Sequence, residues 1–172
     1  MSTTIGLGIG AANTGDLIDK LSSVARKYGY NLKKGTQYAE EDVLQGLTVT
    51  KEILRWQEVA LLGTNDTACG VLAFGIHNEL TTYETQRTRP KFFDFLDEMS
   101  QLASAYVDKI TLFFASEWNR SDHVKFSYGS VEQLICLLSL PGHWGGRYLI
   151  PETGHFQDSD EVPFVYEIVL QG

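Results

Sequence analysis

Apolar residues recur at helical spacing in three stretches of the chain, which predicts three helices. The first begins after a cap at Asn13 or Thr14 and ends at Gly29. Its apolar face is formed by Leu17, Leu21, Val24 and Tyr28. The second begins at Pro90, and its apolar face is formed by Phe92, Phe95, Leu96, Met99, Leu102, Ala103 and Tyr106. In the third, Ser130 and Gln133 form a capping box ahead of Val131, Leu134, Ile135 and Leu138.

Runs rich in β-branched and aromatic residues predict strands at 3–9, 71–77, 109–116, 124–128, 147–150 and 162–170. Residues 79–89 are polar and rich in threonine, which is compatible with an edge strand or a loop. Residues 49–62 fit neither periodicity, and residues 40–45 are compatible with a short helix. The order predicts a single α+β domain over residues 1–172, with a mixed or mainly antiparallel sheet and about three helices packed on it.

The net charge limits the partners that the protein can bind. The 172 residues carry a formal charge of −8, and the sequence pI is about 4.9. Such a surface repels a polyphosphate, so nucleic acid is not an expected partner, whereas a basic protein is. Neither a secretory signal nor an apolar run long enough for a membrane span is present, so we expect a cytoplasmic protein that does not bind membranes.

The acid excess is concentrated at the carboxyl end. Residues 129–172 carry six acids against one base, Arg147. The acids are Glu132, Glu152, Asp158, Asp160, Glu161 and Glu167. Large aromatic residues alternate with them, at Trp144, Tyr148, Phe156, Phe164 and Tyr166. Acids mixed with large aromatics are typical of a surface that binds a basic partner.

Motifs for cofactors and metals are weak. Residues 6–11 (GLGIGA) match a dinucleotide-binding glycine pattern, but only five residues precede them and the next helix starts too late, which favours a glycine-rich strand. The four histidines, His77, His123, His143 and His155, lack the close spacing of metal ligands. We therefore expect no cofactor and no metal.

Candidate catalytic groups are few. Cys69 and Cys136 both have apolar neighbours in the sequence, so each is expected to behave as a small buried hydrophobe, with a disulfide between them left open. Glu117, Asp122 and His123 follow the predicted strand 109–116 and would suit acid–base chemistry. They define an alternative function, a small hydrolase or transferase.

Two loops near the carboxyl end each have two interpretations. Residues 140–148 (LPGHWGGRY) combine glycines with Trp144 and Tyr148, which suits either a binding anchor or a turn whose tryptophan packs on the core. Residues 157–162 (QDSDEV) lack the glycine and the later acid of an EF-hand loop, so they form either a solvated acidic face or a contact patch.

The stretch from Leu112 to Leu170 resembles the C-terminal part of some bacterial immunity proteins of contact-dependent or polymorphic toxin systems. The residues that carry the resemblance are the strand ending Phe113-Phe114-Ala115-Ser116-Glu117-Trp118, the helix start at Gly129-Ser130, the Trp144 loop and the closing aromatic strand. It covers about a third of the chain. It implies a cytoplasmic, non-enzymatic protein that binds one cognate toxin domain and blocks its active site. Toxic nucleases are commonly basic, which would suit the acid excess.

The main hypothesis is therefore an acidic immunity protein that neutralises a basic toxin by binding it. The expected partner-binding residues are Trp118, Asp122, Trp144, Tyr148, Asp158, Asp160 and Glu161. The acids would steer association, and the aromatics would form the desolvated centre of the interface. The sequence leaves the oligomeric state open. A third hypothesis is a homo-oligomer in which the strand 162–170 pairs with its copy.

Overall fold

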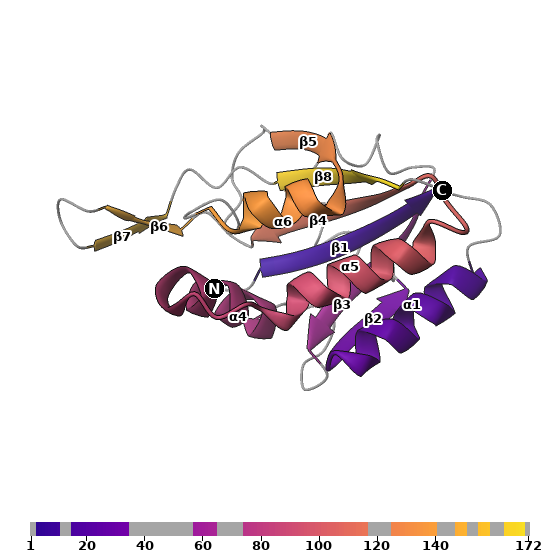
Figure 1. Cartoon of the computed structure of the whole chain (residues 1–172), viewed down its shortest axis with the longest axis horizontal. Helices are drawn as coiled ribbons and strands as arrows, with labels where there is room; N and C mark the ends of the chain where they lie inside the picture. The colour runs from indigo at the N-terminus through magenta and orange to yellow at the C-terminus, as the bar shows by residue number, and fades with distance from the viewer. Residues whose placement is uncertain are drawn as a thin grey trace.

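The computed structural model describes residues 3–10, 15–34, 57–64, 74–116, 125–140, 147–150, 155–158 and 164–170 (Figure 1). The strands of these ranges are β1 (Thr3–Gly10), β2 (Tyr30–Lys34), β3 (Gln57–Thr64), β4 (Lys109–Ser116), β5 (Lys125–Gly129), β6 (Arg147–Ile150), β7 (His155–Asp158) and β8 (Phe164–Val169). The helices are α1 (Gly15–Lys27), α4 (Phe74–Gln86), α5 (Lys91–Ala103) and α6 (Val131–Leu138). Within the described ranges, none of these helices has the length and apolar character that crossing a bilayer requires.

Six strands form one sheet in the order β2-β3-β1-β4-β8-β5. Every neighbouring pair is antiparallel except β8 and β5, which are parallel. β6 and β7 form a separate antiparallel ribbon that extends from one end of the molecule (Figure 1). The predicted α+β fold with a mixed, mainly antiparallel sheet is confirmed, although the described residues contain four helices rather than about three.

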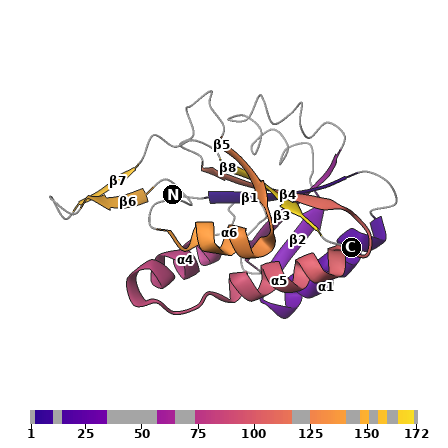
Figure 2. The same cartoon turned by 45° about the horizontal axis from the view of Figure 1, so that its top comes forward.

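The four described helices lie on one face of the sheet (Figure 2). Because side chains alternate along a strand, each strand turns every second residue toward the helices. Facing pairs of β1 and β4 are Ile5 with Phe114, Leu7 with Leu112 and Ile9 with Ile110. All six of these side chains are buried, so the two central strands form the floor of the core.

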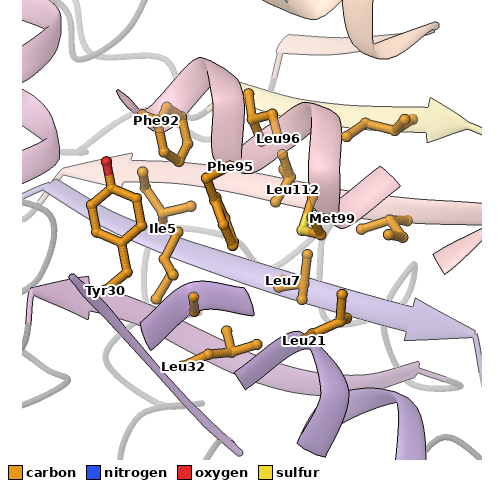
Figure 3. Close-up of a cluster of buried hydrophobic side chains, with 14 of the residues drawn as sticks. Ile5, Leu7, Leu21, Tyr30, Leu32, Phe92, Phe95, Leu96, Met99 and Leu112 are labelled. Atoms are coloured by element: carbon orange, nitrogen blue, oxygen red, sulfur yellow. The ribbon is translucent and has the colours of Figure 1, made fainter. Parts of the chain in front are cut away.

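Helix α5 covers this floor with the apolar stripe that the sequence predicts. Figure 3 shows Phe92, Phe95, Leu96 and Met99 pointing toward β1 and β4. Tyr30 of β2 joins them, with its ring centroid 5.4 Å from that of Phe95 in an edge-to-face arrangement. Burying one such side chain contributes about 1.5–3 kcal/mol, so this contact contributes strongly to the stability of the described fold.

The glycines of residues 6–10 lie inside β1 rather than at a turn. β1 pairs with β3 on one side and β4 on the other, and α1 starts only at Gly15. A dinucleotide site needs its glycines at the junction of a strand and a helix, where the helix N-terminus reaches the phosphates. The interpretation of this segment as a glycine-rich strand is therefore confirmed.

The helix ends follow the local signals in the sequence. α1 is followed by Gly29 in a left-handed conformation (φ 78°), which a residue with a Cβ adopts only with strain. Pro90 occupies the N-cap of α5. Ser130 and Gln133 form the predicted capping box of α6, with backbone-to-side-chain bonds of 2.9 and 3.1 Å.

Residues 74–86 form α4, so the predicted strand is wrong for residues 74–77, and the predicted edge strand or loop is wrong for residues 79–86. Residues 87–89 do lie in a loop between α4 and α5. Glycine and threonine lower the intrinsic helix propensity of this segment. Tertiary packing overrides that preference: Ile76 and Leu80 are buried, and the Tyr83 ring lies 5.6 Å from that of Phe93 in α5. Residues 71–73 lie outside the described ranges.

Other differences concern short elements. The sequence patterns do not predict β2 or β7. Residues 49–62 fit neither periodicity, and those of them that the structure describes belong to the strand β3. α5 ends at Ala103, so Tyr106 lies beyond it with 45% of its surface exposed and contacts Lys20. The strands at 109–116, 125–129, 147–150 and 164–169 agree with the predictions. The possible helix at 40–45 lies outside the described residues.

If the contact of α5 with β1 and β4 contributes strongly to stability, Leu96→Ala should lower the free energy of unfolding by about 3 kcal/mol, because it leaves a cavity at a fully buried position. Urea unfolding followed by circular dichroism measures this. Gln101→Ala, on the exposed side of the same helix, is the control and should change the value by less than about 0.5 kcal/mol. A loss below about 1 kcal/mol for Leu96→Ala would contradict this account.

Candidate functional site

Two of the seven predicted partner-binding residues, Tyr148 and Asp158, lie on the β6–β7 ribbon. Tyr148 is the register partner of Gln157, and Asp158 is that of Arg147, so the two predicted residues occupy adjacent positions of the ribbon. The other five lie outside the described residues: Trp118, Asp122, Trp144, Asp160 and Glu161. The register places the backbones of the two residues one position apart and Asp158 directly opposite Arg147, so it does not put Tyr148 and Asp158 on one face of the ribbon.

The alternative catalytic residues Glu117, Asp122 and His123 also lie outside the described residues, and the hydrolase or transferase hypothesis stays untested. Of the histidines, cysteines, aspartates and glutamates in the described ranges, no three are close enough together to hold a metal ion.

Strand β8 is internal, which corrects two predictions. It pairs with β4 on one side and β5 on the other, so it has no free edge for pairing with a second copy of the chain. The homo-oligomer hypothesis is therefore wrong in that form. Tyr166 is 2% exposed, and its hydroxyl donates to the backbone oxygen of Ser130 over 2.9 Å. This aromatic ring belongs to the core and is not available as part of a partner-binding surface.

Cys136 is a free, exposed thiol, so its predicted role as a small buried hydrophobe is wrong. The reason is the direction of the helix face: α6 buries Leu134 and Leu138 against the core. Position 136 lies between them, two residues from each, and faces the opposite side of the helix. Cys69 lies outside the described residues.

The outer surface of α5 and α6 is acidic. The charged residues of these two helices are four acids and one base: Asp94, Asp97, Glu98, Glu132 and Lys91. Cations from neighbouring segments pair with three of the acids. Arg89 lies 3.1 Å from Asp94 and 3.4 Å from Asp97, and Lys27 of α1 lies 3.0 Å from Glu98. Glu132 has no salt bridge with any residue that the structure describes.

A cavity of about 430 Å³ lies between these helices and the end of β8. We call it the α5–α6 cavity. One wall is a face of α5, formed by Asp97, Ser100, Gln101 and Ser104. The start of α6 adds Ser130, Val131 and Glu132, and the end of β8 adds Ile168, Val169 and Leu170. The cavity thus combines two carboxylates, several hydroxyls and an apolar wall.

The Asp97 carboxyl is held at an electrostatic cost. Burial raises its pKa above the ordinary value, and the negative charges of Asp94 and Glu132 raise it further, while the Arg89 guanidinium lowers it. The influence of Glu132 means that charges on opposite walls of the cavity repel each other. An added cation between them would relieve that repulsion.

Glu98, the next residue along α5, has the opposite environment. It accepts hydrogen bonds from the Tyr28 hydroxyl and from Lys27, and these contacts hold the pKa of its carboxyl below the ordinary value. The same bond to Glu98 raises the pKa of Tyr28 to about 12. The surroundings of Glu98 therefore stabilise its ionised carboxylate, whereas those of Asp97 disfavour ionisation.

Ser100, in the wall of the cavity, is 6% exposed, and its fully buried Oγ has no hydrogen-bond partner among the residues that the structure describes. An unsatisfied buried hydroxyl costs about 1–3 kcal/mol, so such groups are rare. Sequence reasoning missed this residue. The available signal was a polar residue inside the apolar stripe of α5, four positions after Leu96 and three before Ala103.

A second cavity, of about 310 Å³, lies between α4 and the start of α5, and each charged side chain that lines it has a partner of opposite charge. Glu79 accepts a hydrogen bond of 2.7 Å from the Tyr30 hydroxyl and lies 3.7 Å from the Lys91 ammonium. Burial, together with the contact to Glu79, raises the pKa of Tyr30, so it remains a donor. This cluster links β2, α4 and α5 and is satisfied without a ligand.

The contrasting environments of Asp97 and Glu98 predict opposite effects at pH 7. Asp97→Asn should raise the free energy of unfolding, because it removes a carboxylate whose pKa is raised in the folded state. Glu98→Gln should lower it, because it removes a carboxylate whose pKa is lowered. Both differences from the natural protein should vanish as the pH falls below the pKa values of these carboxyls. Urea unfolding from pH 7 to pH 3 measures them, and two shifts of the same sign would contradict the assignment.

The chain was compared with family models, with curated proteins and with solved structures, and none of the three comparisons found a match.

Proposed function

We propose that this chain is an acidic binding protein that neutralises a cognate basic toxin domain by covering its active site, as an immunity protein does. The observation that carries the proposal is the acidic outer surface of α5 and α6. The two helices carry four acids and one base; Arg89 and Lys27 pair with three of the acids, and Glu132 has no salt bridge with any residue that the structure describes. The α5–α6 cavity contains a carboxylate on each of two helices. A protein maintains such repulsion at a cost in stability, and binding of a positively charged partner would offset that cost.

The overall charge supports the same class of partner. At −8, the long-range field of the protein attracts a basic protein and repels nucleic acid. Opposite charges accelerate association, which matters for an inhibitor that must reach its toxin before the toxin acts.

The β6–β7 ribbon supports a contact near the carboxyl end. It extends from the main sheet and carries Tyr148 and Asp158 at adjacent positions (Figure 1). Tyrosine is enriched among residues that dominate binding energy, and an acid on the same ribbon suits a basic surface. A ribbon of this kind can enter the cleft of an enzyme and exclude its substrate.

The first test uses the partner that the proposal implies: the C-terminal domain of a large secreted protein encoded next to this chain. Expressed alone, that domain should stop growth, and co-expression of this chain should restore it. The association rate constant, measured by stopped flow, should fall about tenfold or more between roughly 50 and 500 mM NaCl, because salt screens the attraction between the two proteins.

Dissociation serves as the internal control, since its rate constant should change much less over the same range. An association rate constant that is independent of ionic strength, or a partner that is itself acidic, would overturn the proposal.

A charge-matched pair of variants tests the location of the contact. Asp158→Asn combined with Asp160→Asn and Glu161→Gln should slow association several-fold, because it removes three charges from the predicted interface. The control removes three exposed charges elsewhere, by changing Asp16, Asp19 and Asp108 to Asn. Equal slowing by the two triple variants would show that only net charge matters and would contradict a contact at the carboxyl end.

A further inference from the structure

Among the described strands, β5 forms one edge of the six-stranded sheet (Figure 1). It pairs with β8 on one side, and no residue that the structure describes pairs with it on the other. The backbone of this edge is accessible: Gly129, which has no side chain, is partly exposed, whereas Gly6 and Gly8 of the inner strand β1 are buried. An accessible edge presents unpaired N–H and C=O groups that can pair with another strand.

The residues of β5 do little to protect this edge. Proteins commonly shield an edge strand with charges or a proline, and residues 126–129 (FSYG) contain neither. Tyr128 is 73% exposed, the largest exposed fraction among the large apolar side chains that the structure describes. Its register partner is Glu167 of β8, whose two neighbours along the strand, Tyr166 and Ile168, are buried on the helix side. Tyr128 therefore lies on the opposite face of the sheet.

The charges at the two ends of β5 have opposite signs. Lys125 begins the strand, and Glu132 lies in the first turn of α6, three residues after the strand ends at Gly129. Glu132 is exposed and has no salt bridge with a described residue. If two copies of β5 pair antiparallel, the lysine end of each lies beside the glutamate end of the other, so the edge is complementary to itself. A strand from a basic protein would be attracted at one end only and repelled at the other.

We propose that two copies of this chain associate through β5, in antiparallel register with Ser127 on the two-fold axis, so that the two sheets become continuous. In this register Tyr128 lies opposite position 126 of the other copy, which is a phenylalanine, and aromatic residues directly opposite each other stabilise a strand pair. The two-fold axis produces this pair twice. A strand of five residues makes a small interface, so we expect a dissociation constant of about 10–100 μM. The inference goes beyond the proposed function and does not rest on it, because it concerns association of the chain with itself.

The first experiment follows the full chain over a range of concentrations. Sedimentation velocity should show mostly monomer at about 5 μM and mostly dimer at about 500 μM. NMR spectra of the ¹⁵N-labelled chain over the same range should show concentration-dependent shifts at the backbone amides of Ser127, Tyr128 and Gly129. A monomer at every concentration, or shifts confined to other segments, would overturn the proposal. It would also be wrong if these amides shifted only when a different protein was added, because the edge would then bind that protein.

A pair of matched variants locates the interface. Tyr128→Lys should weaken dimerisation about tenfold or more, because it replaces an aromatic contact with a charge that lies close to the same charge of the other copy. Leu140→Lys is the control, since it also adds one positive charge at an exposed apolar position, 54% exposed and beyond the end of α6. It should change the dissociation constant less than about twofold. An unchanged circular dichroism spectrum confirms that each variant folds, and equal effects of the two would contradict an interface at β5.

A charge exchange tests the antiparallel register. Lys125→Glu alone and Glu132→Lys alone should each weaken dimerisation about threefold or more, because each places like charges together at both ends of the paired strands. The double variant carries the same two charges in exchanged positions and has the net charge of the natural chain.

The double variant should therefore return the dissociation constant to within about twofold of the natural value, because opposite charges meet again at each end. A double variant that dimerises as weakly as the single variants would show that the two ends do not meet, and it would overturn the proposed register.

Discussion

The packing of α5 on β1 and β4 is the contact on which the other features of the described structure depend. It buries the aromatic and aliphatic stripe of one helix on the two central strands (Figure 3). Because α5 contacts α1, α4 and α6, its position sets where those helices lie. The same contact turns the polar side of α5, with Asp97 and Gln101, toward the start of α6. The α5–α6 cavity is therefore a consequence of core packing, although its lining is largely polar.

The cavity contains groups that lower the stability of the free protein. Burial, Asp94 and Glu132 oppose ionisation of Asp97, although Arg89 favours it, and Ser100 Oγ has no partner among the described residues. Elsewhere in the described core, Thr111 Oγ1 is also buried without a partner among the described residues, whereas the hydroxyls of Tyr30 and Tyr166 are paired with Glu79 and Ser130.

The helix starts and the central strand show how local chemistry predicts structure. The capping box of Ser130, the proline at position 90 and the glycine at position 29 act on neighbouring backbone groups, so a sequence reader can locate α6, α5 and the end of α1. The residues of α4 predict a strand followed by an edge strand or a loop, because glycine and threonine lower their intrinsic helix propensity. The helical form of α4 depends on Ile76 and Leu80 packing against distant elements.

The sequence by itself determined the α+β class, the acid excess and the order of most strands and helices, because periodicity and charge are properties of local segments. Only the tertiary structure decided that β8 is internal, that Cys136 is exposed and that Asp97, Ser100 and Glu132 share one cavity. Those facts depend on the direction in which each face points and on contacts between residues more than thirty positions apart. No local pattern encodes such contacts, since they arise from the way the helices pack on the sheet.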